Sequence, residues 1–340
     1  MIPRHPLSLL LALCSLASFP ILASTELIEI QRLVSTNLPA LSPDQLAAPT
    51  VDELLARLAP RVRWTEPETH QAKDPAPVTA PRRHDGNIGY IQLTSISGDA
   101  DTRLSSALDD LQKEGALQGL VLDLRFAGGR DFGASARVSS LFLSGGEPVL
   151  DWGDGVFAAP GRSNHFSAPV AVLVNSHTRG AAEALAAALR SAGRAVVVGD
   201  RTAGEASQMR DFTLSTGRVL RLAVAPVRTG DGQPIATEGL SPDIRVTTPA
   251  EAERRFVLDP FAAPPGSAAG PSDPAQATSG RRRVSEAELI RNKRQSLGLP
   301  DLPQASDPEH APQTGNAARV QDPALARGLD FVTGLNAVRN

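Results

Sequence analysis

The sequence predicts an α/β protein built on a mostly parallel sheet that is covered by helices. Strand and helix patterns alternate between residues 86 and 256, as expected of successive βαβ units. The strand patterns are short, unbroken apolar runs, which are typical of strands buried on both faces. Two later strand patterns flank a Thr216-Gly217 turn and indicate an antiparallel hairpin appended to the sheet. With 340 residues and 41% hydrophobic content, the chain can hold one sizeable core plus extensions.

Each element of this core follows from its own pattern. Apolar runs predict strands at Ile88–Leu93, Gly119–Leu124, Val170–Val174 and Ala195–Val198. The helix after the first strand should present one apolar face, formed by Leu104, Ala107, Leu108 and Leu111. Another helix is expected at Ala181–Arg190, where two leucines lie one turn apart. The hairpin is expected to pair Phe212–Leu214 with Val219–Val227.

The N-terminus has the layout of a secretory signal peptide over residues 1–24. Arg4 and His5 precede an apolar run from Leu7 to Leu22, and small residues follow at Ala23 and Ser24. The run, of about 16 residues, is short for a membrane span. We therefore expect an exported protein of the periplasm or cell envelope, which contacts a membrane only if this segment stays uncleaved.

Simpler patterns flank the core. Residues 25–85 predict a short helical segment, capped near Thr50 or Asp52, and then a Pro-rich linker over Glu66–Pro81. Residues 257–282 are rich in Pro, Ala, Gly and Ser and predict a flexible linker. Residues 283–340 predict an extended, partly disordered tail with short helices at Val284–Ile290 and near Leu325–Leu335.

Composition excludes several function classes. The net charge of −3 gives no footprint for nucleic acid. Cys14, the only cysteine, lies in the signal segment, so a mature chain has no thiol for disulfides, metal or nucleophilic catalysis. The histidines have no metal-binding spacing, and neither a P-loop nor a GxGxxG run follows a strand. We expect no metal, no nucleotide and no other cofactor.

One stretch, AVLVNSHTRGAAEALAAALR from Ala171 to Arg190, has the pattern of an active-site scaffold. An apolar strand is followed by a tight polar turn and by a helix that starts on small residues. The free N–H groups at such a helix start suit an oxyanion or a carboxylate. The tip of the turn is Gly180, which has no side chain to react.

Five motifs resemble the C-terminal processing, or tail-specific, proteases in order and spacing. They are IGYIQL from Ile88, GLVLDLRFAGG from Gly119, VLVNSHTRGAAE from Val172, GDRTAG from Gly199 and GDGQPIATEGLSPDIRV from Gly230. The resemblance implies a ClpP- or crotonase-like core and an exported serine peptidase that cleaves proteins near their C-termini with a Ser–Lys dyad. Such proteases usually insert a PDZ domain before the core. Only Pro67–Asp85 is available for it here, so we expect that domain to be absent.

At neither position of the Ser–Lys dyad does this sequence have the residue that the resemblance implies. Alignment on Glu183 places Gly180 at the nucleophile, and Glu205 follows Thr202-Ala203-Gly204 where the family has its lysine. The chain has only three lysines, Lys73, Lys113 and Lys293, none of them in this region. Arginine stays protonated and cannot replace a lysine base. The resemblance also implies amides at Gly128 or Gly129 and at Ala181 that would hold an oxyanion, and these could bind a peptide carbonyl or terminal carboxylate without cutting it.

Other groups could in principle restore chemistry. Ser176 or Thr178 is a candidate nucleophile with His177 as its base, and Ser207 could approach Glu205. The crotonase-like relationship also suggests proton transfer by Glu183 and Glu205 next to a carbonyl.

These observations predict a pseudo-protease that binds peptides or the C-termini of exported proteins without cleaving them. The main alternative is an active serine-type endopeptidase that uses Ser176 or Thr178 in envelope protein processing. A third hypothesis is a purely structural envelope protein that binds through its tail helices.

Overall fold

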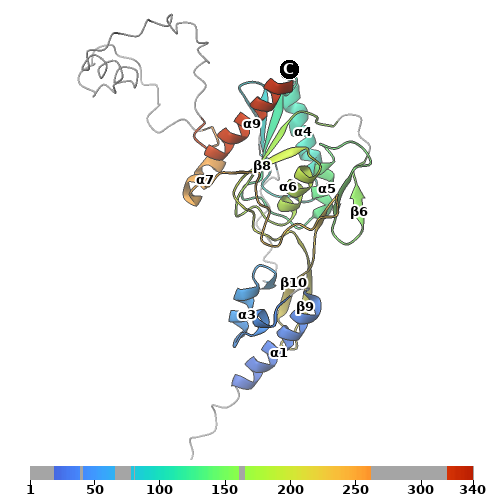
Figure 1. Ribbon diagram of the computed structural model, residues 1–340, viewed down its shortest axis with the longest axis vertical. Helices are drawn as coiled ribbons and strands as arrows, with labels where there is room; N and C mark the ends of the chain where they lie inside the picture. The colour runs from blue at the N-terminus through green and yellow to red at the C-terminus, as the bar shows by residue number, and fades with distance from the viewer. Residues whose placement is uncertain are drawn as a thin grey trace, which may run out of the picture.

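The computed structural model describes residues 19–38, 41–65, 78–79, 81–160, 165–261 and 320–339. These residues form an α/β core and a smaller unit of helices and strands at one end of it (Figure 1). Most of the predicted signal peptide, most of the Pro-rich linker, most of the flexible linker and the helix expected at Val284–Ile290 lie outside the described residues.

The core is built on a six-stranded sheet that confirms the predicted fold class. Its strands are, in spatial order, β12 (Ile244–Arg245), β8 (Ala195–Gly199), β7 (Val170–Val174), β4 (Gly119–Asp123), β3 (Ile88–Gln92) and β2 (Arg82–His84). All neighbours pair in parallel except β2, which runs antiparallel to β3. Every residue of β3, β4 and β7 is buried, as unbroken apolar runs predict.

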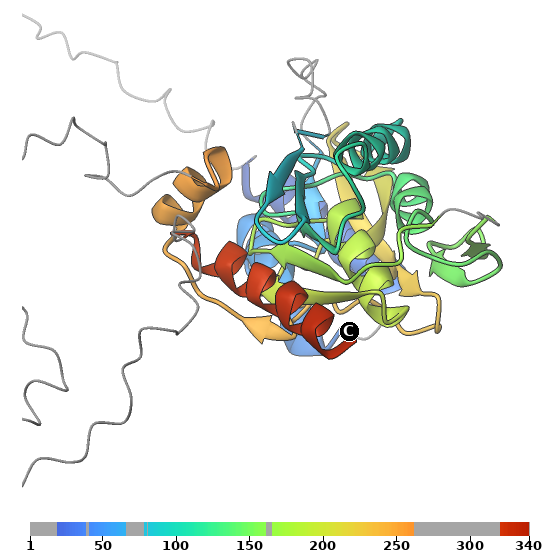
Figure 2. The same cartoon turned by 90° about the horizontal axis from the view of Figure 1, so that it is seen from above.

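Helices cover both faces of this sheet. One face carries α4 (Ala100–Gln112), α5 (Phe132–Ser139) and α6 (Ala181–Ser191), and the opposite face carries α9 (Pro323–Arg339), as Figure 2 shows. The four predicted apolar residues of α4 are buried in the first layer. The helix expected near Leu325–Leu335 is α9, whose Leu325, Leu329 and Val332 pack against the sheet. It lies so close to β4 that a Cβ on Gly119 would be 2.0 Å from a Val332 methyl.

A buried ion pair fixes the start of α9. The Asp322 carboxylate lies 2.6 Å from Nη2 of Arg125 and also caps α9 by accepting from the amide of Ala324. The Arg125 guanidinium donates through Nε and Nη2 to Asp123 at the end of β4, at 3.0 and 2.6 Å. All three side chains are inaccessible to solvent. Asp322, far along the chain from Asp123 and Arg125, therefore supplies the second carboxylate of this buried charge cluster.

The smaller unit combines segments from distant parts of the sequence. It contains α1 (Phe19–Asn37), α2 (Pro43–Leu46), α3 (Val51–Leu58), β1 (Val62–Trp64), β9 (Ser207–Thr213) and β10 (Val219–Pro226). Thr50 caps α3 as predicted, by accepting from the Glu53 amide. Strand β10 pairs with both β1 and β9, and Leu220 and Leu222 share an apolar core with α1 and α3.

The hairpin is thus present but does not extend the six-stranded sheet, in contrast to the expectation that it is appended there. It forms a separate three-stranded sheet because β1 offers it an antiparallel partner, in which Val62 lies opposite Leu222. Strand β1 has only three residues, with Arg63 at its centre, and such a segment gives little strand signal.

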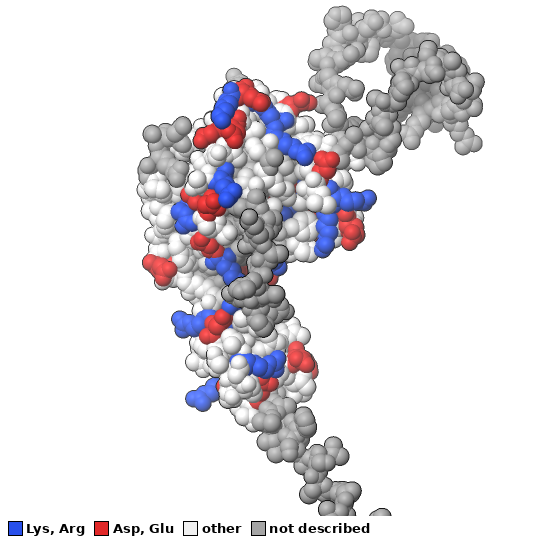
Figure 3. Space-filling model, turned by 180° about the vertical axis from the view of Figure 1, so that it is seen from behind, with Lys and Arg blue, Asp and Glu red and all other residues white. Residues whose placement is uncertain are grey.

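Several short elements complete the described residues. Strands β5 (Pro148–Asp151), β6 (Val156–Ala158) and β11 (Arg228–Thr229) form a small antiparallel sheet, and α7 (Ala250–Leu258) follows β12. The sequence did not predict α5, β5, β6 or α7, which are short and have weak periodicity. None of the described helices is both long and apolar enough to cross a bilayer. Acidic and basic side chains are interspersed on the face shown in Figure 3.

Candidate functional site

The turn after β7 places Gly180 at the N-cap of α6, in a backbone conformation that favours glycine. Its φ is 58° and its ψ is −117°. A Cβ at this position would lie 2.3 Å from the carbonyl oxygen of Gly129. Both the backbone angles and the close approach therefore exclude an ordinary side chain in this conformation.

The carboxylate of Glu183 ties this turn to residues 202–205, where the resemblance predicts the lysine of the dyad. Its two oxygens accept four hydrogen bonds: from the amide of Gly180 at 2.8 Å, the hydroxyl of Thr202 at 2.5 Å, and the amides of Gly204 and Glu205 at 2.7 Å each. Burial raises the pKa of Glu183 above its ordinary value, and the four donors act in the opposite direction. Both oxygens are engaged, and this carboxylate therefore ties the turn to residues 202–205. The proton transfer that the crotonase-like relationship suggests for Glu183 stays a prediction.

Glu205 lies beside Gly180 but turns its carboxylate towards the smaller unit. Its carbonyl oxygen is 3.9 Å from the position of a Cβ on Gly180, so the two family positions are neighbours in space. The Glu205 carboxylate forms an ion pair with Arg63 of β1 at 3.1 Å. In the described part of the chain Lys113 is the one lysine present, and it pairs with Asp110 at the end of α4.

The amides that were predicted to hold an oxyanion lie beside Gly180, but the amide of Ala181 already has a hydrogen-bond acceptor within the protein. The amide of Ala181 donates to the carbonyl oxygen of Gly129 at 2.9 Å, while Ile96 donates to the carbonyl oxygen of Gly128 at 2.8 Å. Both glycines line the pocket described below. An anion could therefore reach the Ala181 amide only if the Gly129 carbonyl moved aside.

Ser176 and His177, the candidate substitute pair, are brought into contact on the exposed part of the turn. The hydroxyl of Ser176 lies 3.3 Å from Nδ1 of His177, whose ring stacks on Phe126 with a centroid distance of 5.0 Å. Thr178 is fully buried and donates to the carbonyl oxygen of Leu124 at 2.8 Å. Its hydroxyl is therefore unavailable to a substrate in this conformation.

Ser207, the other candidate hydroxyl, is buried next to Glu205 at the start of β9. Its amide donates to the carbonyl oxygen of Glu205 at 2.8 Å. The Glu205 carboxylate faces Arg63, with which it forms an ion pair, and not the Ser207 hydroxyl. Of the substitute hydroxyls, Ser207 is the one that lines the pocket.

Asn175 holds the two turns together. Its side-chain oxygen accepts from the amides of Phe126 and His177, both at 3.1 Å, and its side-chain nitrogen donates to Glu253 of α7. Burial raises the pKa of Glu253.

No group of three or more potential metal ligands occurs among the described side chains.

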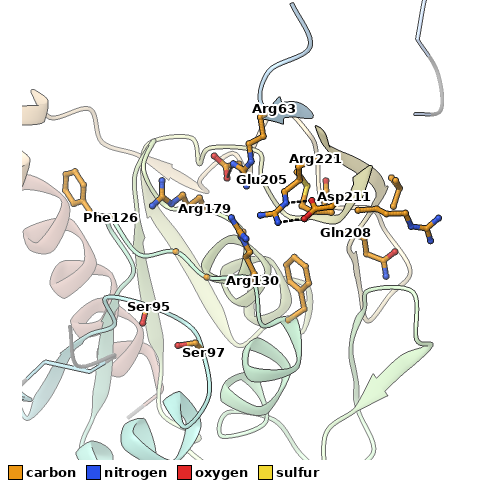
Figure 4. Close-up of a pocket in the computed structure, with 18 of the residues that line it drawn as sticks. Arg63, Ser95, Ser97, Phe126, Arg130, Arg179, Glu205, Gln208, Asp211 and Arg221 are labelled. Atoms are coloured by element: carbon orange, nitrogen blue, oxygen red, sulfur yellow. Dashed lines mark hydrogen bonds and ion pairs between the residues drawn. The ribbon is translucent and has the colours of Figure 1, made fainter. Parts of the chain in front are cut away.

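A pocket with a volume of about 980 Å³ opens beside Gly180, between the core and the smaller unit. Its lining residues are Arg63, Thr94, Ser95, Ser97, Phe126, Gly128, Gly129, Arg130, Phe132, Arg179, Gly180, Glu205, Ser207, Gln208, Met209, Arg210, Asp211, Arg221 and Val224. Figure 4 shows Arg63, Arg130, Arg179 and Arg221 gathered around Glu205 and Asp211. No local sequence pattern predicts that these four arginines meet, because they come from four separate segments. Two of them, Arg130 and Arg179, could have been predicted to lie near the site, because each directly adjoins a glycine of the two turns.

We expect Gly180→Ser to lower the free energy of unfolding by about 1–3 kcal/mol, because the new Cβ collides with the Gly129 carbonyl at a strained backbone position. Urea denaturation of the purified variant measures this change. Gly217→Ser is the matched control, since Gly217 also has a positive φ but nothing within 4 Å of an added Cβ. An equal loss in both variants would contradict the proposed collision.

The comparisons with known proteins agree with the five motifs. Residues 87–246 match the model of peptidase family S41. The carboxy-terminal processing protease CtpA of Bacillus subtilis is 31% identical over 177 residues, which are 51% of this chain and 38% of the relative. The carboxyl-terminal-processing protease of Picosynechococcus sp. is 35% identical over 159 residues, 46% of this chain and 38% of the relative.

Among solved structures, the photosystem II D1 C-terminal processing protease is similar, with 29% sequence identity and a TM-score of 0.42 over 51% of this chain and 48% of that one. The chain spans less than half the length of the curated relatives named above. Over residues 87–246 the chain is similar to peptidase family S41, and through its α/β core it is a homologue of the C-terminal processing serine peptidases.

Proposed function

We propose that this protein is an exported pseudo-protease that binds peptides or protein C-termini without cleaving them. The observation that carries the proposal is the state of the nucleophile position. It holds Gly180, and the carbonyl oxygen of Gly129 fills the space that a nucleophilic side chain would need. The base position supports the same conclusion, because Glu205 is there and is paired with Arg63.

The pocket beside these two positions supports binding. Its volume of about 980 Å³ lies at the upper end of the range typical of ligand sites, about 300–1,000 Å³. Residues of β9, one of the two edge strands of its three-stranded sheet, line this pocket, and an extended peptide could add to such an edge through main-chain hydrogen bonds. Relatives named as C-terminal processing proteases suggest protein C-termini as the ligands.

An active peptidase with an unusual nucleophile is the second candidate. The contact of 3.3 Å between Ser176 and His177 favours it. Against it, both residues are exposed and neither lines the pocket. Thr178, the other nucleophile considered for this alternative, is buried with its hydroxyl bonded to Leu124.

One experiment separates the two candidates. The purified protein is incubated with unstructured fluorogenic peptides and with a fluorophosphonate probe, beside an intact Ser–Lys protease as positive control. We expect neither labelling nor cleavage above the rate without protein. Labelling that is abolished by Ser176→Ala or Ser207→Ala, in variants that unfold like the parent protein, would overturn the pseudo-protease proposal.

A further inference from the structure

The pocket is strongly basic although the chain as a whole is not. Five arginines and two carboxylates line it, whereas the chain carries a net charge of −3. Such a local excess of positive charge attracts anions, because low-dielectric walls focus the field of a concave site. The charge of this pocket therefore points to an anionic ligand.

Two of the arginines stand at the turns that flank the empty nucleophile position. Arg179 directly precedes Gly180, and Arg130 directly follows Gly129. The side chain of Arg179 lies over Gly128, with its Nε 3.0 Å from the position of an added Cβ. Both guanidinium groups therefore lie where a peptide would approach the degenerate site (Figure 4).

The two carboxylates of the pocket are already engaged by other arginines. Glu205 pairs with Arg63, and Asp211 forms a two-point ion pair with Arg221, with distances of 2.5 and 2.6 Å. This ion pair, helped by the charge of Arg130, lowers the pKa of Asp211. Arg179 forms no ion pair within the described ranges, so its charge is available to a ligand.

The remaining lining favours a peptide over a small inorganic anion. Apolar side chains of Phe132, Met209 and Val224 share the pocket with the arginines. Strand β9, at one edge of its sheet, contributes Ser207 to Asp211 to the lining. Guanidinium groups bind carboxylates through two parallel hydrogen bonds, which gives both affinity and orientation.

We propose that this pocket binds the carboxylate-bearing end of an acidic peptide, with Arg130 and Arg179 as the main contacts. The proposal rests on the non-catalytic binding proposed above and names its ligand class. The shared chemistry is a peptide carboxylate, which can come from the chain terminus or from Glu and Asp side chains near it.

Four fluorescein-labelled peptides of about ten residues test this ligand class by fluorescence anisotropy. One ends in Ala-Glu-Glu with a free carboxyl group, the second is its C-terminal amide, and the other two carry Gln in place of Glu in the free and amidated forms. We expect the first to bind most tightly and the neutral amide to bind least, at low ionic strength where charge interactions are little screened. A loss on amidation assigns binding to the α-carboxylate, and a loss on Glu→Gln exchange assigns it to side chains.

Arginine variants test the contacts. Arg130→Gln and Arg179→Gln are each expected to weaken binding of the acidic peptide about tenfold, in line with the loss of one charge-assisted hydrogen-bonded contact. Arg32→Gln, on the exposed surface of α1 and far from the pocket lining, is the control and should leave the dissociation constant unchanged. Unfolding midpoints of the variants establish that they are folded.

The outcomes separate this inference from the proposed function. Equal binding of all four peptides, or acidic-peptide binding that neither Arg130→Gln nor Arg179→Gln weakens, overturns the inference and leaves non-catalytic binding in place. Binding of none of the peptides overturns both. Cleavage of the acidic peptides overturns the pseudo-protease proposal, while arginine-dependent affinity in the same assay still supports the ligand class.

Discussion

Glu183→Gln is expected to lower the free energy of unfolding by about 3–4 kcal/mol. Each oxygen of the native carboxylate accepts two hydrogen bonds, and a glutamine has only one oxygen. Its NH2 group would face two donors inside the protein, where an unsatisfied buried donor costs about 1–3 kcal/mol. Urea denaturation followed by circular dichroism measures the change, given two-state unfolding.

The control for this prediction is Glu53→Gln. Glu53 occupies the same third position of α3 that Glu183 occupies in α6, but its side chain is 42% exposed and forms an ion pair with Arg57 on the helix surface. Such a surface pair is worth less than about 1 kcal/mol. If Glu183→Gln cost no more than Glu53→Gln, the buried carboxylate would not be the tie between Gly180 and Glu205 that we describe.

Asp322→Ala is expected to cost about 3–5 kcal/mol and to release α9 from the sheet. The substitution removes one partner of a fully buried ion pair and leaves part of the Arg125 charge uncompensated. It also removes the cap of α9 at the amides of Ala324 and Leu325. Hydrogen exchange should then show lost protection in α9 together with lower global stability.

Asp330→Ala, on the exposed side of the same helix, is the matched control and should change stability by less than about 0.5 kcal/mol. Similar losses in both variants would mean that the removal of any carboxylate near α9, and not the loss of the ion pair with Arg125, determines the effect.

The packing of α9 on the sheet also affects the test of the tail hypothesis. A deletion of Arg281–Asn340 also removes α9, so lost partner binding in that deletion would not distinguish a tail site from an unfolded core.

The sequence predicted the parts of this fold that depend on local pattern. Unbroken apolar runs identified β3, β4, β7 and β8, because burial on both faces leaves little choice of residue type. The positions of Gly180 and Glu205 could also be predicted, because each lies in a motif of fixed spacing.

The parts that sequence reasoning missed depend on distant partners or on backbone orientation. Arg63 reaches the site only because β1 pairs with β10, and no pattern near residue 63 specifies that pairing. The carbonyl oxygen of Gly129 accepts the hydrogen bond of the Ala181 amide. Its direction depends on the orientation of one peptide plane, which residue types do not reveal. The lining of the basic pocket likewise comes from six segments that meet only in the folded chain.

The pairing of β1 with β10 also constrains the order in which a nascent chain can fold. Domains generally fold from the N-terminus as they leave the ribosome. Here Val62 must wait for Leu222, its partner across the strands, to be synthesised. A chain that stopped before Val219 would expose the apolar faces of α1 and α3, including Ile30 and Leu54, to solvent. Ile30 and Leu54 are therefore made early but buried only after β10, which leaves a long interval in which a holding factor could capture them.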